Sequence, residues 1–180
     1  MRKLYVLLLL IGLGLIGWVG YDYSTSGEEV ARFELAGEAG STDLISLDSS
    51  QNPMRALLSV EYEIELSSSS TPAFEYSVLM TGPGGIEAFK AEGQQRDKRE
   101  DNTPEYATKT SEQVIETFSV SAPGDYLLDW RVMPDRAKII SQKISLRRNV
   151  EPLRVSHLIA GGVCFALGVL FLIRGRRKNS

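Results

Sequence analysis

The stretch ALLSVEYEIEL, residues 56–66, decides the fold class of this chain. Its apolar and polar side chains alternate one by one, with Leu58, Val60, Tyr62, Ile64 and Leu66 set against Ser59, Glu61, Glu63 and Glu65. Successive side chains of a strand point to opposite faces, so the pattern predicts a strand with one face in a core and the other in solvent. Glutamates on the solvent face are ordinary for such a strand, and we do not interpret them as a binding site.

The same alternation continues along the middle of the chain. AFEYSVLMT, residues 73–81, repeats it, and the intervening SSSSTP predicts the turn of an antiparallel hairpin. Further strands are predicted at residues 30–36, 43–47, 86–91, 114–120, 126–132 and 137–146. About eight short strands with turn signals between them predict an antiparallel β-sandwich, either jelly-roll or immunoglobulin-like.

Residues 92–113, EGQQRDKREDNTPEYATKTSEQ, interrupt this rhythm because they contain no aliphatic side chain larger than alanine. The composition predicts a mobile, solvated loop within the domain. The alternative is a loop that binds a partner protein, for which the candidate residues are Arg96, Asp97, Arg99, Glu100, Asp101 and Tyr106. The carboxylates lack the spacing of a calcium loop and are interleaved with basic residues, so no metal site is predicted.

Two apolar segments flank the strand-rich region. Residues 4–21 and 155–173 are 18 and 19 residues long and contain no charged side chain. As helices they would extend roughly 27 and 28 Å, close to the thickness of a bilayer core. The chain is therefore expected to comprise a transmembrane helix at residues 1–21, an exported domain at 22–152, a second transmembrane helix at 153–174 and a basic tail at 175–180.

The distribution of charge predicts the orientation of these spans. All 23 acidic residues lie between Asp22 and Glu151, and this middle region, with Arg154 included, holds 14 of the 20 Lys and Arg residues, a net charge of −9. Basic residues at both ends predict cytoplasmic termini, an exported centre and contact of the tail with lipid headgroups. The acidic centre argues against nucleic-acid binding. A cleaved signal peptide at the N-terminus, which would leave a single span, is the alternative.

The inventory of reactive side chains is small. The only histidine, His157, and the only cysteine, Cys164, both lie in the second apolar segment. The exported region can therefore form neither a Ser-His-Asp nor a Cys-His arrangement, and we expect no enzyme, no cofactor and no metal site. The absence of cysteines and of glycosylation acceptors from that region favours the bacterial inner membrane, with the domain in the periplasm.

Small residues in the two apolar segments predict helix packing. Ala160, Cys164 and Gly168 recur every four residues, Gly161 lies beside them, and the first segment offers Gly14 and Gly17, among other glycines. Such residues let helix backbones approach closely, so the two spans are expected to pack on each other or on the helices of a partner. We therefore expect an accessory or scaffolding subunit that binds other integral membrane proteins or itself. The alternative is a membrane-tethered sensor whose domain binds a ligand, such as a glycan.

Overall fold

The structure is a computed structural model that describes residues 2–67, 69–99 and 105–177. The chain divides into two compact units. The β domain is Gly27–Val150, and the helical unit combines Met1–Ser26 with Glu151–Ser180. Each unit has its own internal packing and is described by itself.

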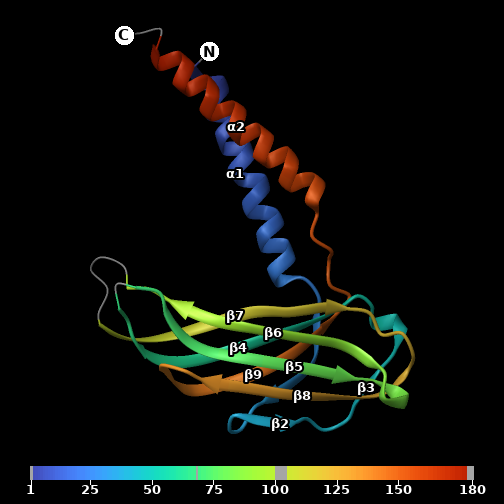
Figure 1. The fold of residues 1–180 in the computed structure, drawn as a ribbon. Helices are drawn as coiled ribbons and strands as arrows, with labels where there is room; N and C mark the ends of the chain where they lie inside the picture. Colours follow the sequence, from blue (N-terminus) through green and yellow to red (C-terminus); the bar gives the residue numbers. More distant parts are fainter. Residues whose placement is uncertain (1, 68, 100–104, 178–180) are drawn as a thin grey trace. The chain divides into compact units, whose positions relative to one another are not determined.

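The β domain consists of two antiparallel sheets with nine strands among the described residues (Figure 1). The first sheet has the order β1-β9-β4-β7 and the second has the order β2-β8-β5-β6, with β3 also paired to β8. The strands are β1 (Glu28–Glu34), β2 (Ala39–Ser41), β3 (Ile45–Leu47), β4 (Met54–Glu65), β5 (Thr71–Thr81), β6 (Glu87–Asp97), β7 (Tyr106–Phe118), β8 (Gly124–Pro134) and β9 (Ala137–Arg148). Two short 3₁₀ turns, Ser49–Gln51 and Pro83–Gly85, connect strands.

Strand β4 confirms the alternation on which the fold class was predicted. Leu58, Val60, Tyr62, Ile64 and Leu66 are all at most 2% exposed and belong to one core that both sheets contribute to. The glutamates between them lie on the other face. There Glu61 accepts a hydrogen bond from Ser141, and Glu63 forms an ion pair with Lys138 across to β9.

The prediction of a loop over residues 92–113 is wrong for most of its length. β6 continues to Asp97 and β7 begins at Tyr106, so residues 92–97 and 106–113 belong to strands. The inward positions of these strands hold small or polar side chains such as Gln95 and Ser111, which gave no apolar alternation to recognise. The strands are specified by pairing with β5 and β4 rather than by their own hydrophobicity.

Strand β2 also differs from the prediction, because residues 39–41 carry no strand pattern in the sequence. The sequence there is Ala-Gly-Ser, and all three residues are exposed. Gly40 lets this strand approach β8 closely, since a Cβ atom at this position would lie 3.1 Å from the Trp130 ring. The position of this strand is set by its backbone pairing with β8, which no local sequence pattern indicates.

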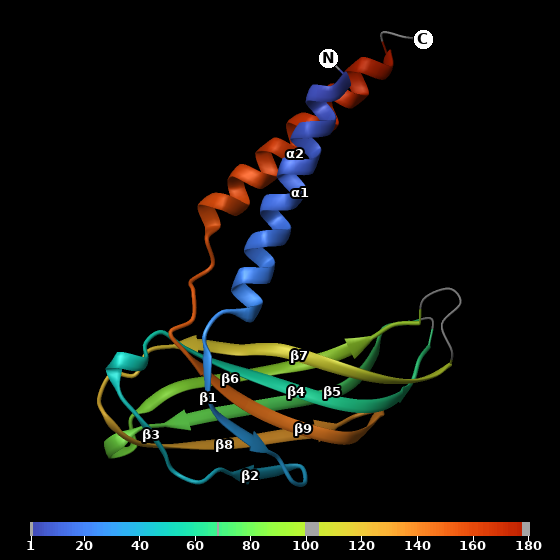
Figure 2. The same ribbon diagram turned by 180° about the vertical axis from the view of Figure 1, so that it is seen from behind.

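The helical unit contains α1 (Arg2–Thr25) and α2 (Val155–Arg177), which run side by side with both chain ends at the same end of the pair (Figure 2). The segments Val6–Tyr23 and Val155–Arg174 are long and apolar enough to cross a bilayer. Large apolar side chains such as Leu10 and Ile159 are more than 60% exposed within this unit.

Candidate functional sites

The two helices meet along a seam of glycines. A Cβ atom on Gly12 would lie 2.7 Å from the Phe165 backbone nitrogen and 2.8 Å from the Gly161 carbonyl oxygen. A Cβ atom on Gly168 would lie 2.8 Å from the Leu9 side chain. Distances this short mean that only glycine permits the observed backbone separation, as expected where membrane helices pack closely.

The small residues singled out in the sequence take different places in the helical unit. Gly161 and Gly168 are buried in the seam, and Cys164 is half-buried between them. Ala160 is exposed, and a Cβ atom on Gly14 or Gly17 would have no neighbouring atom within 4 Å. On α1 the seam uses Gly12, which the three-residue spacing of Gly14 and Gly17 did not pick out.

A cluster of aromatic and charged side chains closes the end of the helix pair where α2 begins. The Trp18 and His157 rings lie edge to face with their centroids 5.9 Å apart, and the Arg154 guanidinium lies 5.3 Å from the centre of the Trp18 ring. Arg154 also lies 3.8 Å from Asp22 and 3.3 Å from Glu151. These contacts tie the two helices together with side chains that suit a membrane–water boundary.

A polar cluster joins β6 to β7 and β4. The Tyr62 hydroxyl donates to Asp97 at 2.6 Å, and the Lys109 ammonium donates to the other oxygen of Asp97 at 2.7 Å. Burial favours the neutral carboxyl, but the hydrogen bonds from Lys109 and Tyr62 outweigh it and lower the pKa of Asp97. Burial, together with the Asp97 carboxylate, raises the pKa of the Tyr62 phenol. The cluster is therefore a structural contact between the two sheets in which both oxygens of Asp97 accept a hydrogen bond.

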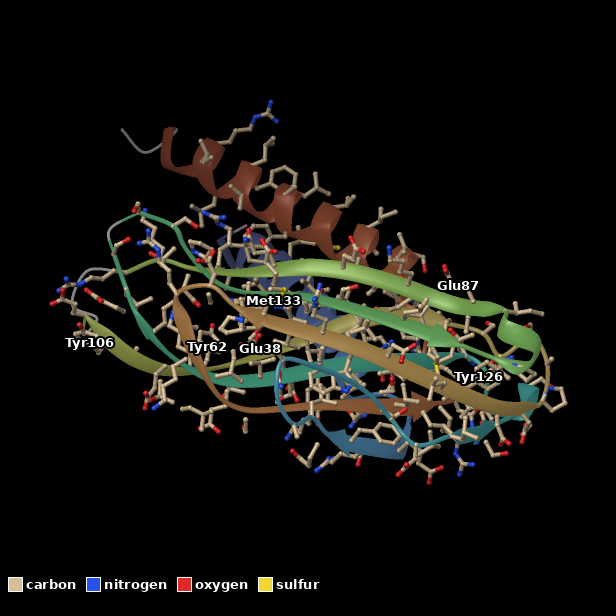
Figure 3. The ribbon with its side chains drawn as sticks, turned by 60° about the horizontal axis from the view of Figure 1, so that its bottom comes forward. Glu38, Tyr62, Glu87, Tyr106, Tyr126 and Met133 are labelled. Carbon is tan, nitrogen blue, oxygen red and sulfur yellow. The ribbon has the colours of Figure 1, made fainter. Side chains whose placement is uncertain are left out.

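The structure separates the candidate residues of the predicted partner-binding loop. Asp97 is committed to the polar cluster with a side chain only 10% exposed, and Arg96 donates to Ser70 and Gln94. Arg99 lies just beyond β6, while Glu100 and Asp101 lie outside the described residues. Tyr106 opens β7 and is 70% exposed at the same end of the domain as Tyr62 (Figure 3).

An aromatic platform of the kind that binds sugars does not form among the described residues of the β domain. Trp130 is buried at 6% exposure, and Tyr76 is half-buried over Gly93. Tyr106 is the one aromatic side chain there that is largely exposed. Within the described part of the chain, no three His, Cys, Asp or Glu side chains lie close enough together to hold a metal ion.

A cavity of about 340 Å³ lies where the chain crosses from β1 to β2. We call it the crossover pocket. Its aliphatic lining is Leu35, Val132, Pro134, Ala137, Ile139 and Ile140, and its polar lining includes Glu38, Lys138, Ser141 and Gln142. Ile140 is the extra residue where the register of β9 against β4 shifts, and such bulges recur beside binding sites. Sequence reasoning missed this site because its residues come from three separate segments.

Comparison with known proteins identifies no family for this chain. No protein-family model matches the sequence, and neither does any curated protein. Thirteen solved chains are similar in structure. One of them, dimeric latent PorU from Porphyromonas gingivalis, is 11% identical and covers 72% of this chain at a TM-score of 0.29. The match spans only 11% of that chain, and a TM-score this low supports no argument about fold or function.

Proposed function

We propose that this chain is a non-enzymatic, two-span protein of the bacterial inner membrane, with cytoplasmic termini and a periplasmic β-sandwich that binds other proteins. It would serve as an accessory or scaffolding subunit of a membrane complex. The observation that carries the proposal is the division of glycines on α1. Gly12 packs against α2, whereas Gly14 and Gly17 lie on a second face of the same helix, which another helix could approach closely.

The sheet orders support a jelly roll as the form of the sandwich. The two sheet orders are β1-β9-β4-β7 and β2-β8-β5-β6. Strands that follow each other in the chain occupy the same position in these two orders, as β1 and β2 do, and β8 and β9. A double-sheet jelly roll has this arrangement, whereas an immunoglobulin sandwich divides its strands differently.

Native mass measurement after extraction in a mild detergent tests the proposal. We expect the full chain in a complex heavier than one copy. The Gly14→Leu/Gly17→Leu double variant should shift the chain to the monomer, because both added side chains project from the open face. Ile159→Phe adds bulk at an exposed position of α2, away from Gly14 and Gly17, and should leave the complex intact. A wild-type chain that is monomeric throughout would refute the proposal.

A further inference from the structure

Helix α2 carries an apolar groove beside the seam of glycines. The groove has a volume of about 540 Å³, and its described lining is Phe165, Ala166, Val169, Leu170, Ile173 and Arg174. We call it the α2 groove. Residues three and four apart are neighbours on a helix surface, so these six residues form one stripe along the axis. Phe165 borders the seam, because its backbone nitrogen would lie 2.7 Å from a Cβ atom on Gly12.

The length of the α2 groove matches one leaflet of a bilayer. The nine steps from Phe165 to Arg174 correspond to roughly 13 Å along the helix axis. Half of the hydrocarbon core of a bilayer is roughly 15 Å. Arg174 is the last residue of the apolar segment Val155–Arg174, and both chain ends lie at this end of the helix pair (Figure 2). The groove therefore runs from near the middle of the span to the level of the lipid headgroups.

Arg174 ends the groove with a positive charge that the chain does not neutralise. It is the one charged residue of the described lining, and no described side chain forms an ion pair with it. All acidic side chains of the sequence lie between Asp22 and Glu151, so none belongs to this end of the helix pair. Arg154, just before the other end of α2, differs, because it lies 3.8 Å from Asp22 and 3.3 Å from Glu151. The protein thus provides acidic side chains for the arginine at one end only.

We propose that the α2 groove binds one anionic phospholipid of the cytoplasmic leaflet, with an acyl chain along its apolar residues and the phosphate on Arg174. An empty groove would forfeit dispersion contacts, and an acyl chain restores them. The planar guanidinium of an arginine fits the oxygens of a phosphate. The cytoplasmic leaflet is also the one that carries the anionic lipids. This inference rests on the proposed two-span arrangement, which places Arg174 on the cytoplasmic side.

A second helix fits the α2 groove less well than a lipid does. It could cover the apolar residues, but it would have to bring an acidic side chain to the level of Arg174. The cytoplasmic ends of membrane helices carry an excess of Lys and Arg, so a neighbouring helix would add repulsion there. The face that suits a second helix is on α1, where Gly14 and Gly17 leave open space.

Native mass spectrometry of the full chain in a mild detergent tests the inference by counting bound lipids. The probe is dioleoyl phosphatidylglycerol. Its control is dioleoyl phosphatidylcholine, which has the same acyl chains but a headgroup ammonium that offsets the phosphate. We expect one saturable phosphatidylglycerol per chain, and phosphatidylcholine should bind about tenfold more weakly, the effect of losing one hydrogen bond between charged groups.

Two pairs of variants separate the charge of the groove from its shape. Arg174→Gln should weaken binding of phosphatidylglycerol by about tenfold, whereas Lys3→Gln, which removes a cation from α1 at the same end, should not. Ala166→Phe adds a ring inside the groove and should weaken binding of both lipids. Ala160→Phe adds the same ring at an exposed position of α2 outside the groove and should bind as the wild type does.

Four results would overturn the inference: equal binding of the two lipids, equal loss in Arg174→Gln and Lys3→Gln, unchanged binding by Ala166→Phe, or unsaturable binding of many lipids. If a variant does not fold, the comparison of the two lipids on the wild-type chain still decides the question. The inference and the proposed function also fail separately. A heavy complex that binds no phosphatidylglycerol would refute the groove alone, and a monomer that retains one phosphatidylglycerol would refute the scaffolding role alone.

Discussion

Replacing Gly12 by alanine should weaken the pairing of the two helices. The added Cβ atom would lie 2.7 Å from the Phe165 nitrogen, 2.8 Å from the Gly161 oxygen and 2.9 Å from the Phe165 Cβ atom. Ordinary contact begins at 3.4 Å, so the backbones must separate by about 0.5–0.7 Å at this crossing. None of these three atoms lies at the end of a flexible side chain that could swing away.

The energetic cost follows from two opposing effects. Forcing extra volume into a packed interface costs about 1–3 kcal/mol. The higher helix propensity of alanine returns up to about 1 kcal/mol. We therefore expect Gly12→Ala to lower the free energy of helix separation by up to about 2 kcal/mol, because the propensity gain offsets part of the packing cost. Gly14→Ala is the matched control, because its Cβ atom has open space and gains only the propensity.

Pyrene excimer emission can report the pairing during a titration with sodium dodecyl sulfate. Labels at Trp18→Cys and His157→Cys, in a Cys164→Ala background, lie close together when the helices pair, because the two native rings are 5.9 Å apart. Gly12→Ala should lose excimer emission at a lower detergent fraction than the parent, and Gly14→Ala at the same or a higher fraction. Equal midpoints for the two alanine variants would refute the account of the seam.

Three further changes test other contacts. Asp97→Asn should destabilise the β domain by about 1–3 kcal/mol near neutral pH by weakening its bond with Lys109. Because folding lowers the pKa of Asp97 from its ordinary 3.8, this stabilisation is present above pH 3.8 and disappears as the pH falls through the folded pKa. In chemical denaturation at acid pH, the unfolding free energy of the variant should therefore fall less steeply with decreasing pH than that of the wild type. Gly82→Ala should lower the unfolding free energy by about 1–3 kcal/mol, since its Cβ would lie 2.5 Å from the buried Tyr126 ring, and Tyr126→Leu should remove this added cost in a double-mutant cycle. Cys164→Leu, used in place of Cys164→Ala in the excimer assay, should lower the detergent fraction at which the helices separate, because the side chain is half-buried between the glycines of the seam; equal midpoints for the two variants would refute this packing role.

The sequence predicted strands where apolar and polar side chains alternate clearly, and it missed strands where they do not. The alternation in β4 and β5 was strong, and both strands lie where expected. The polar halves of β6 and β7 face each other through Gln95, Ser111 and Gln113, and such a contact is visible only once the strands are paired. The strand order itself arises from pairings between residues far apart in the chain, which no local pattern records.

The candidate sites show the same limit. The four-residue spacing brought out Gly168, with Gly161 beside the series, and both glycines are buried against α1. Spacing alone did not tell which glycine of α1 would meet them, because that depends on how the two helices are rotated about their axes. The crossover pocket combines residues from β8, β9 and the segment after β1, which no local sequence pattern brings together.

Everything proposed for the β domain requires that it lie across the membrane from both chain ends. Labelling of single cysteines in spheroplasts with a membrane-impermeant maleimide tests this directly, in a Cys164→Ala background. A cysteine replacing the exposed Ser69 should be labelled in intact spheroplasts, whereas a cysteine appended after Ser180 should be labelled only after the membrane is permeabilised. Labelling of both sites in intact spheroplasts, or protection of Ser69→Cys, would contradict the two-span arrangement.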